Sequence, residues 1–422
     1  MLRKMIQITR HCTLLAVALA FASPISAQQL PEGKSIYIPK DLRSNDFNDP
    51  DAQWSYSRMA CTENIVLFWE KGFGDDLSKA PDLDGHPMTV NKENLLQRIE
   101  DFYAYYRDSL RFVLPGSKSE KYRMMVMLNY SLEGTAYGGD YDEEIGALWI
   151  APNRVQDSKL NCIAHELGHS FQSQVSSDGK GEAWGGGGIF EMTSQWMLFN
   201  VNPEWPTDEN YHWKAFIDHA NLRFLDVENI YHSPYILEQW SQKRGLGVMA
   251  DLFREGKRGE DPASTYMRMF NLTNEDFARE AVDCYSRLIT FDFKGKHEQN
   301  KQYAGEFVND KPLQTFGANV LKLSNNGKKK ISVKFRATGD TANDGFAYRL
   351  VKVDKDANAT YGKICTAQTA TLTMSGIAEG EDVYFVATAF PKGQYKPYTF
   401  NPYDRNSQKE EPHVYQYEIK QK

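Results

Sequence analysis

The chain has few cysteines for its length, which excludes one large class of secreted proteins. Only 5 of its 422 residues are cysteine. A disulfide-rich scaffold needs several bridges within a short chain, so the fold must depend on an ordinary hydrophobic core. Four cysteines follow the first 27 residues, and they allow three disulfide pairings. Four unpaired, packed thiols are an equal alternative.

Clusters of basic residues are also scarce. Lys and Arg total 49 against 56 Asp and Glu, which gives a net charge of −7. One short basic run, Lys328–Lys330, lies beside a predicted turn. Because nucleic-acid phosphates are bound by clustered Lys and Arg, we expect no nucleic-acid partner.

Long apolar runs are missing as well. The apolar stretch Thr13–Ala22 follows a basic start and precedes small residues that end at Ala27. This pattern predicts a secretory signal peptide over residues 1–27, and its apolar part is too short to span a bilayer. No later stretch is a candidate membrane span. We therefore expect an exported monomer, either periplasmic or extracellular.

The rest of the chain divides into three regions. Residues 28–60 are polar and broken by prolines, so they are predicted to form an extended segment. Residues 61–300 combine buried strands with amphipathic helices. Residues 313–422 carry short strands separated by polar turns, which is typical of a β-sandwich. The sequence thus predicts an α+β fold followed by an all-β domain.

Five predicted elements of the second region lead up to, or carry, the most informative motif of the chain. We predict strands at Asn64–Glu70, Tyr122–Asn129 and Gly146–Ala151, and helices at Asn91–Phe112 and Ser158–Gln174.

The most informative motif is His-Glu-Leu-Gly-His at residues 165–169, within the last of these helices. Residues four apart lie on one helix face, so His165 and His169 can bind one metal ion from the same side. Glu166 lies beside them, where it can accept a proton from a water molecule. Zn²⁺ chemistry needs this arrangement, with a coordination position left for water and a carboxylate as base.

A third metal ligand is expected downstream. Glu191 is the preferred residue, because it opens a second helix near Ile189 that can run back past the metal. Glu182, in the glycine-rich loop before that helix, is the alternative. An ordinary carboxylate in the first turn of a helix is another interpretation of Glu191.

This part of the chain resembles the gluzincin metallopeptidases, in which His-Glu-x-x-His is followed by a glutamate ligand on the next helix. The resemblance implies that His165, His169 and Glu191 bind zinc, with Glu166 as the catalytic base.

The same resemblance suggests where a substrate would lie. In gluzincins the strand before the metal helix is an edge strand that pairs with the substrate backbone, and Gly146–Ile150 occupies that place in the sequence. Ala147, Leu148 and Trp149 are therefore the expected substrate-binding residues. A plain internal strand is the alternative.

A wider resemblance covers most of the chain. It is similar to a largely uncharacterised family of secreted bacterial proteins known as a domain of unknown function, through Thr62–Trp69, Ala164–Gln172, Phe190–Trp196, Tyr231–Tyr235 and Val386–Pro391. The resemblance implies a zincin-like domain at 61–300, built of a small mixed sheet and a helical subdomain. A sandwich at 313–422 follows. The segment 165–172 also resembles mucin-directed metallopeptidases, which extends the expected substrates to glycoproteins.

Peptide hydrolysis also needs a donor that stabilises the developing oxyanion. His232 and Tyr235 are the preferred pair, because a helix starting near Ser233 could aim both at the cleft. The alternative is that both pack inside an aromatic-rich helical region.

The sequence therefore predicts a secreted zinc peptidase acting on a peptide or protein. The rival is a binding protein in which the zinc site is structural or vestigial and the sandwich binds a glycan or a partner. The retained base, Glu166, argues against a vestigial site. A glycoside-acting enzyme ranks last, because no pair of carboxylates stands out.

Overall fold

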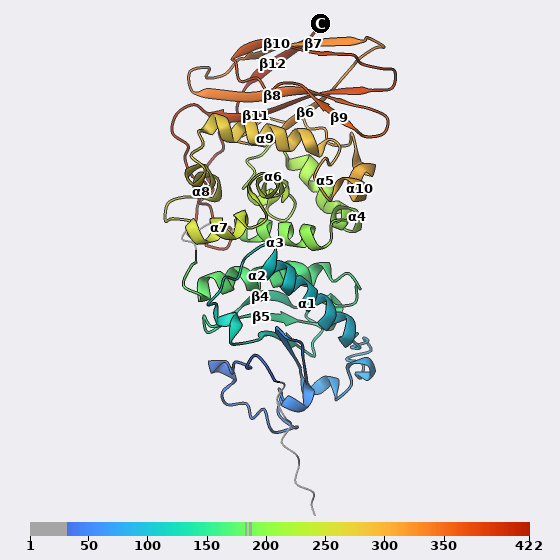
Figure 1. The fold of residues 1–422 in the computed structure, drawn as a ribbon, viewed down its shortest axis with the longest axis vertical. Coiled ribbons are helices and arrows are strands. Elements are labelled where there is room, and N and C mark those ends of the chain that lie inside the picture. The colour runs from blue at the N-terminus through green and yellow to red at the C-terminus, as the bar shows by residue number, and fades with distance from the viewer. Residues whose placement is uncertain (1–31, 182–183, 185–187) are drawn as a thin grey trace, which may run out of the picture.

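The structure, a computed structural model of the 422-residue chain, describes residues 32–181, 184 and 188–422. Figure 1 shows a stack of layers, from an N-terminal sheet through a layer of helices to two C-terminal sheets. The fold is mixed α+β, which confirms the predicted class. The predicted signal peptide lies outside the described residues.

The N-terminal sheet has five strands in the order β1-β2-β3-β5-β4. Its central strands β2 (Ile65–Trp69), β3 (Met124–Leu128) and β5 (Ile145–Ile150) run parallel to one another. The outer strands β1 (Met59–Cys61) and β4 (Ala136–Tyr141) are antiparallel to their neighbours. Every residue of β2 and β3 is buried, as expected for parallel strands covered on both faces.

Two long helices pack beside this sheet. Helix α1 (Lys92–Asp108) is capped by Asn91, whose side chain accepts a hydrogen bond from a backbone N–H of the first turn. Helix α2 (Asn161–Ser177) carries the histidine motif, and it begins later than predicted because Leu160 has a φ of 54°, outside the helical range. The two helices are joined where Tyr106 of α1 donates to a backbone carbonyl of α2 at 2.9 Å.

The middle layer consists of helices that surround buried aromatic rings. They are α3 (Gly188–Val201), α4 (Trp205–Asp208), α5 (Asn210–His219), α6 (Tyr235–Arg244), α7 (Val248–Glu255), α8 (Pro262–Met269), α9 (Asn274–Leu288) and α10 (His297–Asn300). Trp196, Trp205, Trp213 and Trp240 are all fully buried here. Much of the aromatic content of the chain therefore serves the core.

The C-terminal region is a sandwich of two antiparallel sheets, as predicted. Its strands are β6 (Asn319–Leu323), β7 (Lys330–Ala337), β8 (Asp344–Val353), β9 (Ala359–Tyr361), β10 (Thr369–Ser375), β11 (Asp382–Pro391) and β12 (Tyr417–Gln421). They form the sheets β10-β7-β12 and β6-β11-β8-β9. Phe335 of β7 stacks on Tyr348 of β8 with ring centroids 3.9 Å apart, which joins the two sheets.

The sandwich continues the core of the helical layer, because α9 packs on β8 and β11. Phe277 of α9 contacts Phe316, on the segment before β6, with ring centroids 4.4 Å apart. Asp283 of α9 pairs with the buried Arg349 of β8 at 2.7 Å. The two regions thus share apolar and ionic contacts.

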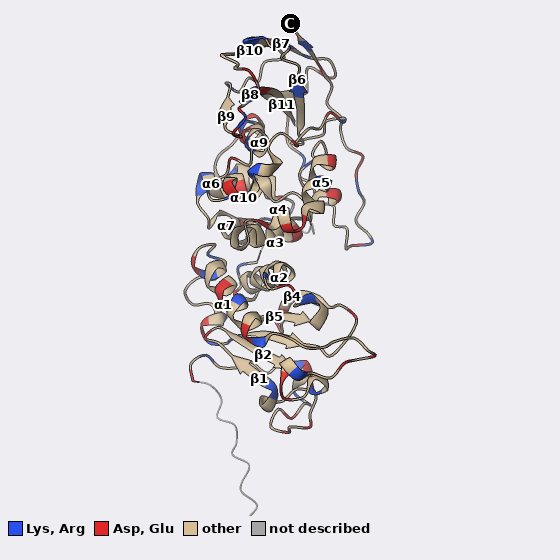
Figure 2. Cartoon of the chain, turned by 90° about the vertical axis from the view of Figure 1, so that its right-hand side faces the viewer, with Lys and Arg blue, Asp and Glu red and all other residues tan. Residues whose placement is uncertain are grey.

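The described cysteines, Cys61, Cys162, Cys284 and Cys365, are all unpaired, so the structure favours packed thiols over disulfides. Burial raises the pKa of Cys162, on the metal-motif helix, to about 11. Figure 2 shows basic and acidic residues interspersed over the layers that face the viewer. Within the described ranges, no helix is both long and apolar enough to cross a bilayer.

The contact between α9 and the sandwich generates a stability prediction. Replacing Phe277 by Ala empties a site lined by Phe224, Trp240, Tyr266 and Phe316. Because the cavity cannot close around so many rings, we expect a loss of about 3–5 kcal/mol in unfolding free energy. Urea denaturation measures it, with Thr371→Ala on an exposed position of β10 as a control expected to change by less than ~0.5 kcal/mol. A loss below ~1 kcal/mol for Phe277→Ala would contradict the shared core.

Candidate metal centre

Helix α2 lies between the sheet and α3 at distances that require glycine on both sides. A Cβ atom at Gly138 of β4 would lie 1.8 Å from the backbone oxygen of Glu166, and one at Gly168 would lie 2.6 Å from Oγ of Ser194 on α3. The backbone of β4 therefore packs directly against α2 at Gly138, and α2 packs directly against α3 at Gly168. The fixed separation places the residues of α2 and α3 opposite one another.

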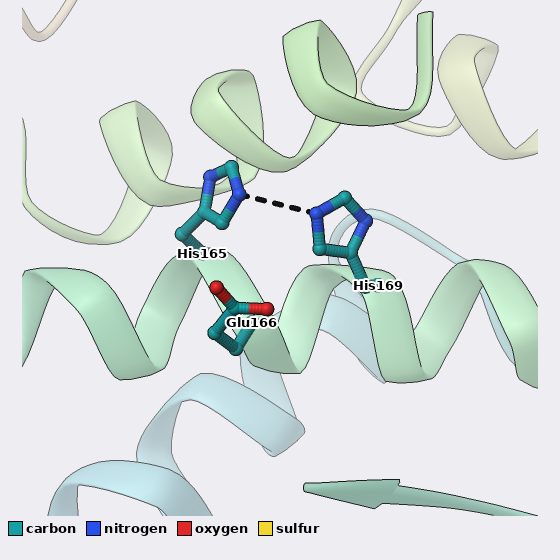
Figure 3. A group of neighbouring side chains, drawn as sticks. All are labelled: His165, Glu166 and His169. Atoms are coloured by element: carbon teal, nitrogen blue, oxygen red, sulfur yellow. Dashed lines mark hydrogen bonds between the residues drawn. The ribbon is translucent and has the colours of Figure 1, made fainter. Parts of the chain in front are cut away.

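Three side chains meet in this space. Figure 3 shows His165 and His169 on successive turns of α2, with their rings on the same side. Their Nε2 atoms lie 3.1 Å apart. Oε2 of Glu191, from the first turn of α3, lies 3.2 Å from each of them.

The tautomers of the two imidazoles follow from their other ring nitrogens. Nδ1 of His165 lies 3.1 Å from Oε1 of Gln195, and Nδ1 of His169 lies 3.0 Å from Oε1 of Gln172. Each glutamine directs its amide nitrogen to a backbone carbonyl, so the oxygens are correctly assigned as acceptors. The Nδ1 atoms must then carry a proton, so in the neutral imidazoles both Nε2 atoms hold lone pairs.

Two nitrogen lone pairs and a carboxylate oxygen therefore converge, an arrangement that requires positive charge between them. Ligand atoms 2.0–2.1 Å from a tetrahedral zinc ion lie ~3.3 Å from one another, close to the three separations found here. Two neutral imidazoles and one carboxylate are also a common donor set of catalytic zinc. The residues fit a zinc ion.

The electrostatics agree with that need for positive charge. Burial alone would raise the pKa of Glu191, but hydrogen bonds with the two histidines hold it well below its usual range. Burial would lower the pKa of His169, yet its hydrogen bond with Glu191 and the charge of that carboxylate raise the pKa overall. A cation, whether a proton or a metal ion, is stabilised at this point.

Glu166 lies beside the three proposed ligands, but its carboxylate is not one of the converging ligand atoms. It forms a group with His165 and His169 whose potential ligand atoms lie within 4.8 Å of one another. Its Oε2 accepts a hydrogen bond of 3.0 Å from the backbone N–H of Gly138. Burial raises the pKa of the Glu166 carboxyl, which suits a group that must accept a proton.

These residues border a cleft of about 650 Å³. Its lining comes from β4, α2, α3 and two later segments of the chain: Ala136, Tyr137, Gly138, His165, Glu166, His169, Gln172, Ser173, Phe190, Glu191, Tyr231, Asn401 and Tyr403. A ligand in the cleft can therefore reach the metal centre and Glu166 together. Glu182, the alternative third ligand, lies outside the described residues.

The predicted substrate-binding residues are misplaced. Ala147, Leu148 and Trp149 belong to β5, which is an internal strand between β3 and β4. Ala147 and Leu148 are buried. The edge of the sheet is β4, which the sequence prediction missed because Gly138 and Gly139 give that segment the composition of a turn.

The predicted oxyanion donors are also absent from the cleft. Tyr235 is fully buried, with its ring centroid 4.8 Å from that of Phe216. His232 pairs instead with His212, their Nδ1 atoms 2.6 Å apart, and burial lowers the pKa of His232 to about 4. The alternative held for both residues, because Tyr235 on α6 and His232 in the turn before it pack within the aromatic-rich helical layer.

Two tyrosines that sequence reasoning missed line the cleft instead. The Tyr403 hydroxyl donates to Oε1 of Glu191 at 2.9 Å, and it lies 3.1 Å from the hydroxyl of Tyr231. Tyr231 lies in the segment Tyr231–Tyr235 that carries the wider resemblance, but the preferred donors were its neighbours His232 and Tyr235. No local pattern marks Tyr403, since 212 positions separate it from Glu191.

Comparisons with known proteins give a family and a set of distant structures. The model of a family of unknown function, DUF6055, matches residues 28–422. No curated protein matches the chain. Three solved structures from Clostridium perfringens show likeness to it, and all are metallopeptidases.

The ZmpB metallopeptidase is 18% identical, with 81% of this chain and 67% of that chain covered and a TM-score of 0.32. The catalytic module of the metalloprotease ZmpA is 13% identical, with 87% and 69% covered and a TM-score of 0.33. The M60 catalytic domain of ZmpB with its CBM51-1 and CBM51-2 domains is 16% identical, with 81% and 36% covered and a TM-score of 0.32. At these identities and TM-scores the likeness does not bear on the activity of this chain.

The geometry of the centre predicts a loss of metal on removal of one ligand. We expect His165→Ala to lose stoichiometric zinc, because only two of the three converging donors would be left. Elemental analysis of the purified full-length protein measures the zinc content. The control is His86→Ala, which removes an exposed imidazole from a turn outside the cleft. Equal zinc in both variants would refute the ligand assignment.

Proposed function

The chain belongs to the family of unknown function DUF6055, and we propose from the geometry of its cleft that it is a secreted zinc-dependent peptidase. In this proposal His165, His169 and Glu191 hold the metal, and Glu166 is the general base. One observation carries the proposal: three potential metal-ligand atoms converge beside a buried carboxylate at the wall of a cleft.

A zinc ion bound there supplies Lewis-acid polarisation of a carbonyl oxygen and lowers the pKa of water. Glu166 accepts the proton that water loses and then delivers it to the leaving amine. The N–H of Gly138 holds one of its carboxylate oxygens, so the other is free to face the water. Burial keeps the proton affinity of Glu166 high enough for both transfers.

The open edge of β4 is the proposed binding surface for the substrate backbone. Thr135, just before β4, accepts a hydrogen bond from Ala151, so alternate residues of the strand turn their backbone groups away from β5. Ala136 and Gly138 are two such residues, and both line the cleft. Gly138 offers a peptide only its carbonyl, because its N–H donates to Glu166. An extended peptide can pair with this edge by strand addition, in place of the pairing first assigned to β5.

Tyr231 replaces His232 and Tyr235 as the proposed donor to the oxyanion. It lines the cleft, and its ring centroid lies 6.1 Å from that of His165. Burial raises the pKa of Tyr231, so its hydroxyl keeps its proton at neutral pH; in this proposal the proton turns from the Tyr403 hydroxyl to the oxyanion when substrate is bound.

The open cleft also favours catalysis over a structural role for the metal. Structural zinc sites are closed by four protein ligands, whereas the converging donors here border a space accessible to a ligand. The proposal includes export, on the signal-peptide pattern of residues 1–27. Its substrate is a peptide or protein, glycoproteins included.

Replacing the base tests the proposal. We expect Glu166→Gln to retain zinc and to lose turnover by roughly 10²–10⁴-fold, because the amide keeps the shape of the side chain and cannot accept a proton. The measurement is cleavage of denatured casein and of a peptide library, with and without a chelator, alongside zinc content. Glu133→Gln, which removes the same charge from an exposed position outside the cleft, is the matched control. Wild-type turnover by Glu166→Gln would exclude the assigned role.

A further inference from the structure

The segment Lys392–Gln416 connects β11 to β12 by a long excursion, and we name it the crossing segment. Instead of turning back directly, it leaves the sandwich and lies along the helical layer (Figure 1). Asn401 and Tyr403, near its middle, line the metal cleft. A part of the C-terminal region therefore reaches the site formed by α2 and α3.

Two anchors hold the crossing segment on the helical layer. The buried carboxylate of Asp261, at the start of α8, accepts hydrogen bonds from the Tyr395 hydroxyl at 2.6 Å and from a backbone N–H three residues further on at 2.8 Å. Beyond the cleft, Nζ of Lys409 lies 2.9 Å from Oδ1 of the buried Asp226. Because these anchors flank Tyr403, its position is set from both sides.

The direction of the hydrogen bonds at Tyr403 is unambiguous. The Tyr403 hydroxyl donates its single proton to Oε1 of the Glu191 carboxylate, so it has no proton left for a second bond. The Tyr231 hydroxyl is then the donor to the oxygen of Tyr403. The chain of donors runs from Tyr231 through Tyr403 to Oε1 of Glu191, while Oε2 faces the two histidines.

We propose that Tyr403 is a positioning residue of the metal centre and that the crossing segment completes the site. This inference rests on the proposed function. A carboxylate on a free side chain can rotate and exchange its two oxygens. Binding Oε1 to Tyr403 would leave Oε2 alone directed at a bound metal ion.

The same contact shapes the cleft. Ala136 and Gly138 of the edge strand line it together with Asn401 and Tyr403 of the crossing segment. A residue carried by the sandwich thus acts on a metal centre whose ligands and base the sequence assigns to residues 165–191. The centre should be sensitive to a change more than two hundred positions away.

Tyr403→Phe in the full chain tests the proposal. Mutating a hydrogen-bond partner of a metal ligand typically lowers metal affinity ~10–100-fold. We therefore expect the zinc dissociation constant to rise by at least ~10-fold. Competition with a chelating zinc indicator measures it. The visible absorption of the Co²⁺-substituted protein should shift as well, since the oxygen contributed by Glu191 changes. Because Tyr403 is 61% exposed, we expect removal of its hydroxyl to leave the fold intact.

The matched control is Tyr398→Phe. It makes the same chemical change on the same segment, at a hydroxyl that has no hydrogen-bond partner among the described residues. We expect its zinc affinity and Co²⁺ spectrum to match those of the wild type. A change in this control equal to that of Tyr403→Phe would overturn the inference.

A double-mutant cycle shows whether Tyr403 acts through Glu191. In the Glu191→Ala background, Tyr403→Phe should have no further effect on zinc affinity. Two results would overturn the positioning role and leave the proposed function standing. One is an equal loss of zinc affinity on Tyr403→Phe in the wild-type and Glu191→Ala backgrounds. The other is an unchanged zinc affinity in the Tyr403→Phe single variant. A wild-type chain that binds no zinc would overturn the proposed function, and this inference with it.

Discussion

Two imidazole nitrogens and one carboxylate oxygen are held about as far apart as the ligands of one tetrahedral ion. Lone pairs at this distance repel one another unless positive charge lies between them. The hydrogen bonds from Nδ1 of His165 and His169 to Gln195 and Gln172 direct the lone pairs inward. The demand for a cation is therefore a property of the assembled fold.

Separate regions of the chain maintain that convergence. The sheet and α3 press on α2 through Gly138 and Gly168, where a side chain would collide with backbone or with Ser194. The edge strand also supplies the N–H that holds Glu166. From the far end of the chain, Tyr403 binds the outer oxygen of Glu191. The site thus combines an N-terminal sheet, a helical layer and a segment carried by the sandwich.

Local chemistry made much of this predictable. The spacing of His165 and His169 requires one helix face, and Glu191 stands where a following helix would return to it. The central strands of the first sheet and most strands of the sandwich follow from their runs of apolar residues or their alternation. Contacts between distant segments were not predictable from such patterns. The edge strand carries a glycine at position 138 because α2 leaves no space for a Cβ there. Together with Gly139, this glycine gives the strand the composition of a turn, so that composition alone does not reveal it. Tyr403 is one of many tyrosines, and only the path of the crossing segment distinguishes it.

The most direct test is diffraction from zinc-grown crystals on both sides of the zinc absorption edge. The account predicts one anomalous peak bounded by Nε2 of His165, Nε2 of His169 and Oε2 of Glu191, with a coordination position open to the cleft. A peak elsewhere, no peak at all, or a fourth protein ligand closing that position would contradict it.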